Sequence, residues 1–333
     1  MVSLQAVRAN NSALKELGPG LVAVFVGGTS GIGESTAREF ARNTDSPRVY
    51  LVGRNQAEAT RITQELQKLN PEGKFHFIKS DLSLLRNVDV ACKEIQAKEE
   101  KINLLFLSCG YLTMKGREET PEGLDRKFSL NYYARMRFAQ NLLPQLSAAS
   151  QSNTLSRVVS VLDPNARGSL VLDDLSLKTH FSLSNCATHA CTMNNLAVEE
   201  LAATNPGISF VHAFPGLVKT GVTRGYGPIL QTGMAALFVL LKPFTVPLGE
   251  SGERHLYAAT SKTFSPKSKP EESAAVGSTG EKGSGAYWLN WNGDPYGGVP
   301  AKMKGYQEKG IGKQVWEHTQ DVFQKVCQEG GKY

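Results

Sequence analysis

The residues that decide the fold are Leu21-Val22-Ala23-Val24-Phe25-Val26-Gly27-Gly28-Thr29-Ser30-Gly31-Ile32-Gly33, which continue into Glu34-Ser35-Thr36-Ala37-Arg38-Glu39-Phe40. The run from Leu21 to Val26 is apolar throughout, which suits a central parallel strand that is covered on both faces. The glycine-rich stretch after it predicts a sharp turn, and the residues that follow predict a helix. We therefore expect an α/β protein with this strand inside its sheet.

Three glycines of this stretch, Gly27, Gly31 and Gly33, predict an anion-binding loop. They allow a sharp turn, let a phosphate approach the main chain and seat a helix whose first N–H groups attract the anion. A glycine-rich turn with no ligand is the alternative. The residues expected to contact a dinucleotide here are Gly27, Thr29, Ser30, Gly31, Ile32 and Gly33.

The composition is that of an ordinary globular protein, with 41% hydrophobic and 20% charged residues among 333. This length allows a large core, and we expect one domain with additions. The formal net charge is +6, but lysines and arginines are scattered among acidic residues and form no basic stripe with interleaved aromatics. Nucleic-acid binding is therefore not expected, and a positive field that attracts an anionic dinucleotide is the simpler explanation.

The cysteines and the N-terminal residues indicate a compartment with reduced thiols. The five cysteines form no C-x-x-C pair, so Cys186 and Cys191 are expected to be packing residues and no metal site is predicted.

Residues Met1 to Gly20 have no apolar core, so a signal peptide or anchor is not expected. The longest apolar run, Met234 to Leu241, is too short to span a bilayer. We expect a cytoplasmic protein.

The glycine spacing G-x-x-x-G-x-G resembles that of the short-chain dehydrogenase/reductase family. The resemblance extends over residues 18–262 and implies a doubly wound, Rossmann-like parallel sheet that binds a nicotinamide cofactor. Where the family has Asn-Asn-Ala-Gly, this chain has Leu107-Ser108-Cys109-Gly110. Because Gly110 alone is strictly kept, we expect part of the usual cofactor hydrogen bonding to be lost.

The end of the second predicted strand, Pro47 to Asn55, indicates which dinucleotide is bound. This position meets the adenosine ribose, where an acidic side chain would accept from the 2′-hydroxyl and repel a 2′-phosphate. Here the loop offers Gly53 and Arg54, and a guanidinium favours the phosphate. The sequence therefore predicts NADP(H) over NAD(H), with a solvated surface arginine as the alternative.

Two further cofactor contacts are implied by the resemblance. Asp81 and Leu82 match the position whose carboxylate contacts the adenine amino group, although an aspartate before a helix also serves as an N-cap. A Pro-Gly turn with a downstream threonine is expected to meet the nicotinamide carboxamide and the pyrophosphate. The residues of that turn are Pro215, Gly216, Val218 and Thr220.

The resemblance also shows that the catalytic positions are altered. The family's serine position falls on Asp163, its tyrosine on Phe181 and its lysine on Asn185. Asn131 matches the mid-helix asparagine that holds a water linked to the active-site lysine. In the family's mechanism the tyrosine gives its proton to the carbonyl as hydride arrives, and phenylalanine has no proton to give.

Three replacements for the lost proton donor can be named. Asp163 would be a protonated acid at neutral pH if an apolar pocket raised its pKa. His180 and His189 lie near the same helix start and titrate in a suitable range. Tyr132 and Tyr133 follow Asn131, and one of them facing the cleft is the third possibility. Asp163 is favoured because it occupies the matched position, with a cap or salt bridge in its loop as the alternative.

The C-terminal third adds to the core. Residues 221–249 lie where the family has its substrate lid, and their apolar helix predicts a lipophilic ligand, with core packing or shallow membrane contact as alternatives. The pocket residues expected from it are Met234, Leu237, Phe238 and Leu241. Residues 263–285 are poor in hydrophobes and predict a mobile loop, and 286–333 predict a strand and an amphipathic helix.

The whole pattern resembles atypical family members from fungal secondary-metabolite pathways, and it leaves three hypotheses open. The first is an NADPH-dependent reductase of a bulky lipophilic carbonyl or imine, with an unconventional proton source or a substrate basic enough to need none. The second is a cyclase, isomerase or pericyclase without redox chemistry. The third is a non-catalytic cofactor-binding protein. A homodimer is possible, since the family's helices around 124–146 and 186–201 commonly pair between subunits.

Overall fold

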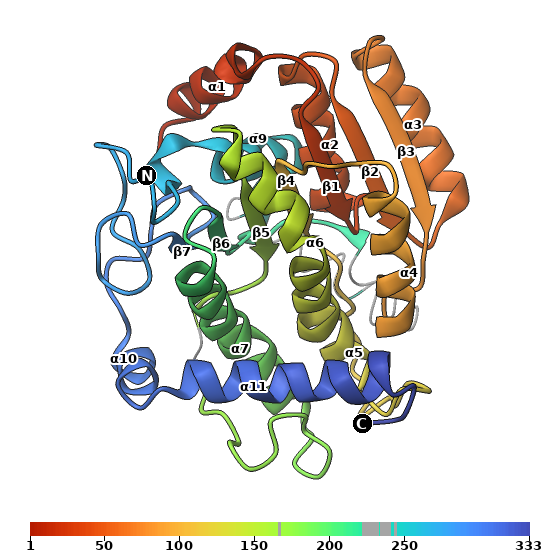
Figure 1. The fold of residues 1–333 in the computed structure, drawn as a ribbon, viewed down its shortest axis with the longest axis vertical. Coiled ribbons are helices and arrows are strands. Elements are labelled where there is room, and N and C mark those ends of the chain that lie inside the picture. The colour runs from red at the N-terminus through yellow and green to blue at the C-terminus, as the bar shows by residue number, and fades with distance from the viewer. Residues whose placement is uncertain (166–167, 222–232, 234–240, 243–244) are drawn as a thin grey trace.

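The computed structural model describes residues 1–165, 168–221, 233, 241–242 and 245–333. Seven strands form one sheet in the order β3-β2-β1-β4-β5-β6-β7, and every neighbouring pair is parallel (Figure 1). This confirms the predicted doubly wound, Rossmann-like α/β fold. The strands are β1 (Val22–Val26), β2 (Arg48–Gly53), β3 (Lys74–Lys79), β4 (Leu104–Leu107), β5 (Arg157–Val161), β6 (Ser209–Ala213) and β7 (Ala286–Leu289).

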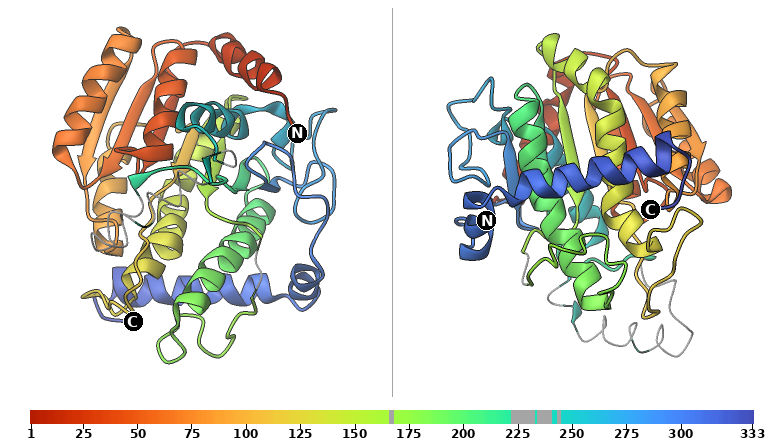
Figure 2. Two further views of the ribbon diagram at one scale, coloured as in Figure 1. Left: turned by 180° about the vertical axis from the view of Figure 1, so that it is seen from behind. Right: turned by 60° about the horizontal axis from the view of Figure 1, so that its bottom comes forward.

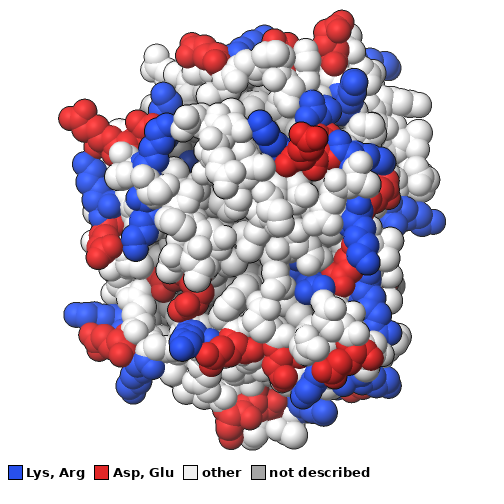
Figure 3. Space-filling view, in the orientation of Figure 1, with Lys and Arg blue, Asp and Glu red and all other residues white. Residues whose placement is uncertain are grey.

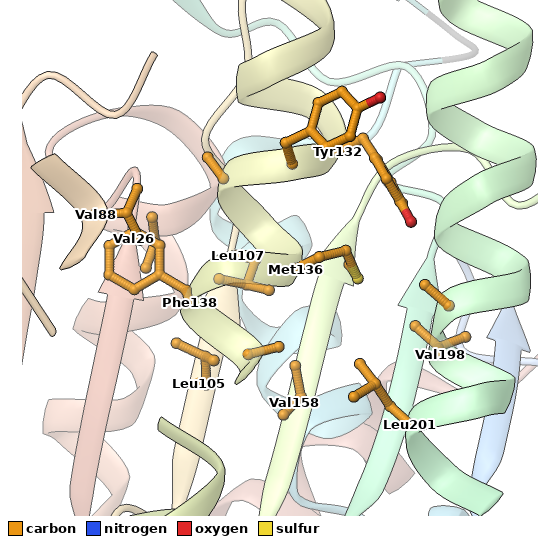
Figure 4. Close-up of a cluster of buried hydrophobic side chains, with 14 of the residues drawn as sticks. Val26, Val88, Leu105, Leu107, Tyr132, Met136, Phe138, Val158, Val198 and Leu201 are labelled. Atoms are coloured by element: carbon orange, nitrogen blue, oxygen red, sulfur yellow. The ribbon is translucent and has the colours of Figure 1, made fainter. Parts of the chain in front are cut away.

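Helices cover both faces of the sheet (Figures 1 and 2). One layer contains α4 (Leu85–Gln96), α6 (Ala134–Gln151) and α7 (Leu183–Thr204), and the other contains α2 (Gly31–Asn43), α3 (Gln56–Leu69) and α9 (Leu248–Thr260). Alternate residues of each strand serve the two layers. In β1, Val24 packs into the first core and Phe25 into the second, so an uninterrupted apolar run is required. Figure 4 shows part of the first core.

The sequence suggested one helix around 124–146, but the structure divides this segment before α6. Asp125 caps the short α5 (Arg126–Phe128), accepting hydrogen bonds from the backbone N–H groups of Lys127 and Phe128. A π-helical turn, Ser129–Tyr133, then leads into α6. The helix continues through Pro144 to Gln151.

The N- and C-terminal residues add elements to this framework. The helix α1 (Leu4–Ser12) packs against α9, where Arg8 pairs with Glu253. At the other end, β7 extends the sheet beside β6, and α10 (Ala301–Glu308) and α11 (Ile311–Phe323) follow. Gln307 of α10 donates to the Glu199 carboxylate of α7 at 2.8 Å.

The helix α11 crosses the layer formed by α6 and α7 (Figures 1 and 2). Its buried side includes Val315, Thr319 and Val322. The helices for which pairing between subunits was expected are thus partly covered by a segment of the same chain. A dimer built on α6 and α7 would have to include α11 in its interface.

The substrate-lid prediction concerns residues that the structure describes only in part. The substrate lid at 221–249 and its residues Met234, Leu237 and Phe238 lie largely outside the described residues.

Of the described helices, none is long and apolar enough to cross a membrane. Within the described ranges, no group of three His, Cys, Asp or Glu side chains could hold a metal ion, and the five cysteines are free thiols.

Candidate cofactor and active site

The glycine loop lies between the carboxyl ends of β1 and β4, where the strand order reverses. Gly27 has a φ of +89°, and a Cβ there would stand 2.7 Å from the backbone nitrogen of Cys109. A Cβ on Gly33 would overlap the hydroxyl of Ser108 and lie 2.6 Å from the carbonyl oxygen of Gly27. Side chains at these positions would push the strands and α2 apart, so the loop requires glycine for close packing.

The start of α2 presents free backbone N–H groups at this loop. Gly31 begins the helix with a φ of +59°, and Ser30 is its N-cap without a side-chain capping bond among the described residues. Ile32 packs on the second core. A helix N-terminus beside a tight glycine turn is the arrangement that binds a pyrophosphate.

The Pro-Gly turn after β6 closes over the glycine loop. Thr220 lies so near that a Cβ on Gly31 would be 3.3 Å from it, and Val218 is buried. Gly216 has a φ of +73°, and a Cβ there would be 2.9 Å from Cβ of Trp291. Trp291, from the C-terminal extension, therefore supports the turn expected to meet the nicotinamide.

The adenosine end is formed by the ends of β2 and β3. A Cβ on Gly53 would be 2.9 Å from the Thr29 hydroxyl, so the exposed Arg54 lies beside the glycine loop. Asp81 follows β3, and its Oδ1 accepts from the backbone and the hydroxyl of Ser83 at 3.1 and 2.8 Å. Leu82 is buried. Both expected adenosine contacts thus lie on the edge that carries Thr29.

Gly110 and Asn131 meet at the end of β4. A Cβ on Gly110 would be 3.1 Å from Oδ1 of Asn131, which belongs to the π-helical turn. The backbone carbonyl of Asn131 accepts a hydrogen bond from Asn194 of α7 at 2.9 Å. The asparagine predicted from the resemblance therefore stands next to the retained glycine.

Asp163 follows β5 at the same edge of the sheet. Its side chain is half-buried, and Oδ1 accepts from the backbone nitrogen of Asn165 at 2.8 Å. Cys191 of α7 lies close by, and burial together with the Asp163 charge raises the pKa of this thiol to about 12. Cys191 is therefore a neutral packing residue.

Phe181 and Asn185 contact residues near α5 and in the loop before α7. The Phe181 ring lies 5.2 Å from Nζ of Lys127, near α5. Asn185 lies in the first turn of α7, and its side chain donates to the carbonyl of His180 at 2.8 Å. Six residues separate Asn185 from Cys191, which corresponds to about 9 Å along the helix. Asn131 thus lies beside Gly110 and Asp163 near Cys191, while Phe181 contacts Lys127 and Asn185 contacts His180.

The two tyrosines do not face the cleft, and that hypothesis was wrong. Tyr132 and Tyr133 are fully buried, and their hydroxyls lie 2.6 Å from the Thr319 hydroxyl and 2.9 Å from Nε2 of His318. Burial raises the pKa of both phenols. Their partners belong to α11, so these tyrosines fasten the C-terminal helix instead of serving as acids.

The two histidines are no better as proton donors. His189 is fully buried and accepts from the backbone nitrogen of Val171 at 2.9 Å, and burial lowers its pKa. His180 is exposed and lies 3.1 Å from the carboxylate of Asp174. Both histidines interact with the loop before α7, and neither contacts Asp163 among the described hydrogen bonds.

Arg135 is a residue at this edge that sequence reasoning missed. It is fully buried and donates to the Cys109 carbonyl at 2.5 Å, the Val161 carbonyl at 2.8 Å and the Ser160 hydroxyl at 2.9 Å. The guanidinium therefore ties the ends of β4 and β5 together. The sequence signal that could have pointed to Arg135 was its position four residues after Asn131, on the same side of a helix.

A cavity of about 630 Å³ opens elsewhere, between the loop before α7 and α11. Its lining includes Asp174 and His318, and no residue of the glycine loop. Asp174 accepts hydrogen bonds from the backbone N–H groups of Lys178, Thr179 and His180. This carboxylate therefore organises its own loop, and the cofactor site is better defined by the converging strand ends.

Comparison with known proteins gives concordant findings. The family model described as short chain dehydrogenase matches residues 21–228. The chain is 46% identical to "Oxidoreductase AN1596" of Emericella nidulans over 98% of this chain and 99% of that protein. It is 39% identical to "Oxidoreductase andH" of Emericella variicolor, with 98% of each covered. The fold matches NADPH-bound carbonyl reductase from chicken fatty liver with a TM-score of 0.56 at 17% identity, covering 83% of this chain and 98% of that one.

Proposed function

The chain belongs to the short-chain dehydrogenase family, and on that premise we propose that it is an NADPH-dependent reductase of a bulky lipophilic secondary-metabolite intermediate. The observation that carries the proposal is the glycine loop, where Gly27 and Gly33 close on β4 and Thr220 closes over Gly31. A packed loop that leaves the N-terminus of α2 facing the sheet edge suits a pyrophosphate. When bound, the nicotinamide would supply the hydride.

The preference for NADP(H) rests on Arg54. It is exposed and directly follows Gly53, which packs on Thr29, at the strand end where the family fold receives the ribose. A planar guanidinium pairs well with a phosphate and gains less from a hydroxyl. The fold neighbour bound to NADPH is in keeping with this preference.

We propose that Asp163 acts at the reacting atom, either as a proton donor or as a carboxylate that pairs with a cation. It follows β5, next to β4 in the sheet, whereas Phe181 can neither give nor accept a proton. If protonated, Asp163 would give its proton to a carbonyl oxygen. If ionised, it would pair with an iminium nitrogen, which needs no proton donor because it is already cationic. Imine and carbonyl reduction thus use the same side chain in opposite protonation states.

A second candidate is a cyclase, isomerase or pericyclase without redox chemistry. It is favoured by Phe181 and Asn185, which stand where the family's tyrosine and lysine are expected and cannot deliver a proton in their way. A non-catalytic cofactor-binding protein is the third candidate. Free thiols favour a cytoplasmic location for all three.

The experiment that tests the proposal measures NADPH consumption with the pathway intermediate, in wild type and Asp163→Asn. A reductase consumes NADPH in step with product, and the variant loses most of its turnover. Product formed at full rate without NADPH would refute the reductase and favour the second candidate. Full activity of Asp163→Asn would refute the role given to Asp163. NADPH binding without any product would favour the third.

A further inference from the structure

Arg126 and Tyr111 form a stacked pair beside the end of β4. Tyr111 directly follows Gly110, and Arg126 is the first residue of α5. The guanidinium carbon lies 5.3 Å from the centre of the Tyr111 ring. Such stacking holds the flat face of an arginine while leaving its edge, which carries the N–H donors, free to bind.

The guanidinium of Arg126 has no hydrogen-bond acceptor within the part of the chain that the structure describes. Its Nε is buried and unpartnered, and no carboxylate of a described residue lies within ion-pair distance. The residue as a whole remains partly exposed. Burying a charged donor without an acceptor is costly, so an arginine in this state is suited to an acceptor that arrives from outside.

The neighbouring charges are already paired, which makes Arg126 different. Lys127 binds the Asp125 carboxylate at 3.2 Å and the Gly116 carbonyl at 2.7 Å. Arg117 pairs with the Glu119 carboxylate and donates to the Gly123 carbonyl at 2.7 Å. The acidic side chains around α5 thus have other cations as partners.

The pair lies at the edge where the proposed reaction takes place. Gly110 precedes Tyr111 and contacts Asn131, and the adjacent Cys109 packs on Gly27 of the pyrophosphate loop. Arg126 begins α5, and Asn131 lies in the π-helical turn that follows it. Since Tyr111 directly follows Gly110 and holds Arg126, a group bound by Arg126 would lie near Gly110.

We propose that Arg126, oriented by Tyr111, binds a planar anionic pair of oxygens on the substrate, either a carboxylate or an ionised 1,3-dicarbonyl. A guanidinium offers two parallel N–H donors that match such a pair. This inference rests on the proposed function in one respect, that the substrate binds beside Gly110. It narrows the substrate from any lipophilic carbonyl or imine to one that also carries an acidic group.

The test uses probes that differ in charge and little in shape. NADPH-saturated protein is titrated calorimetrically with 2-naphthoate and with neutral 2-naphthamide, and separately with the enolate of dimedone. The variants are Arg126→Met, Arg126→Lys and the control Arg42→Met, which removes an arginine paired with Glu39 on α2. We expect wild type and the control to bind naphthoate at least about tenfold more tightly than naphthamide.

In Arg126→Met the preference for naphthoate should vanish. In Arg126→Lys it should fall to an intermediate value, because the charge remains but the two parallel N–H donors of the guanidinium are lost. A larger loss of affinity for dimedone than for naphthoate in Arg126→Met would assign the dicarbonyl as the group, and the reverse order the carboxylate. An unchanged preference in Arg126→Met, no preference in wild type, or loss of NADPH binding in Arg126→Met would each overturn the inference. If wild type fails to bind NADPH, the proposed function fails, and the same titrations without cofactor still judge Arg126.

Discussion

Replacing Glu199 by glutamine should make the protein more stable in mildly alkaline solution and leave it unchanged in acid. Glu199 lies on α7 against α10, where Gln307 donates to its carboxylate at 2.8 Å. Burial raises the pKa of Glu199 to about 7 from an ordinary value of 4.5. Glutamine retains the acceptor oxygen and nearly the same volume, so the substitution removes the charge and little else.

The sign and size follow from the two pKa values. Between pH 4.5 and about 7 the unfolded chain has lost the Glu199 proton and the folded chain still holds it, so stability falls as pH rises through this window. Above about pH 7 the folded chain bears the full cost of a buried Glu199 charge. The difference between the two pKa values of Glu199, about 2.5, corresponds to at most about 3 kcal/mol of unfolding free energy. The gain from Glu199→Gln should therefore approach that value at pH 8 and be close to zero near pH 4.5.

The assay is urea unfolding followed by circular dichroism at pH 5 and pH 8, without cofactor, since a ligand of the folded state would add its own stabilisation. Glu281→Gln, at an exposed carboxylate, is the control and should show no comparable pH-dependent gain. An equal gain at both pH values would mean that packing and not ionisation is responsible. No gain at pH 8 would show that the folded chain accommodates the charge, and would refute the reasoning.

Three further predictions concern the site. Arg54→Ala should weaken NADPH binding by about tenfold and leave NADH binding nearly unchanged in fluorescence titrations; equal losses would refute the 2′-phosphate contact. Gly27→Ala should abolish NADPH binding, because its Cβ would meet the Cys109 backbone, while Gly31→Ala should weaken it less, since Thr220 can give by a few tenths of an ångström. Arg135→Met should lower the free energy of unfolding by at least about 3 kcal/mol in urea, because three buried acceptors lose a charged donor; a smaller loss would mean that water replaces it.

The sheet and the cofactor loop could be predicted from the sequence because their signals are local. The apolar run from Leu21 to Val26 requires cover on two faces, and Gly27 and Gly33 are spaced by the turn that follows. Asp163 could be placed after its strand for the same reason. These features depend on a few neighbouring residues and on the parallel order of strands, so no distant contact is needed to fix them.

The positions of aromatic and ionisable side chains on helices could not be predicted in this way. Tyr132 and Tyr133 carry a polar group on an apolar ring, so their spacing fits a cleft as well as a core. Their burial is decided by Thr319 and His318, more than 180 residues away in the chain. The contact of Phe181 with Lys127 likewise depends on the path of the loop before α7, which no periodicity encodes.

The contact between Gly216 and Trp291 has a consequence for protein engineering. The turn expected to hold the nicotinamide packs on Trp291, which comes after the residues 21–228 that the family model matches. A version trimmed to residues 18–262 would expose that turn to water and lose β7 from the edge of the sheet. Chimeras that exchange substrate specificity between such proteins should therefore inherit both pieces from one parent.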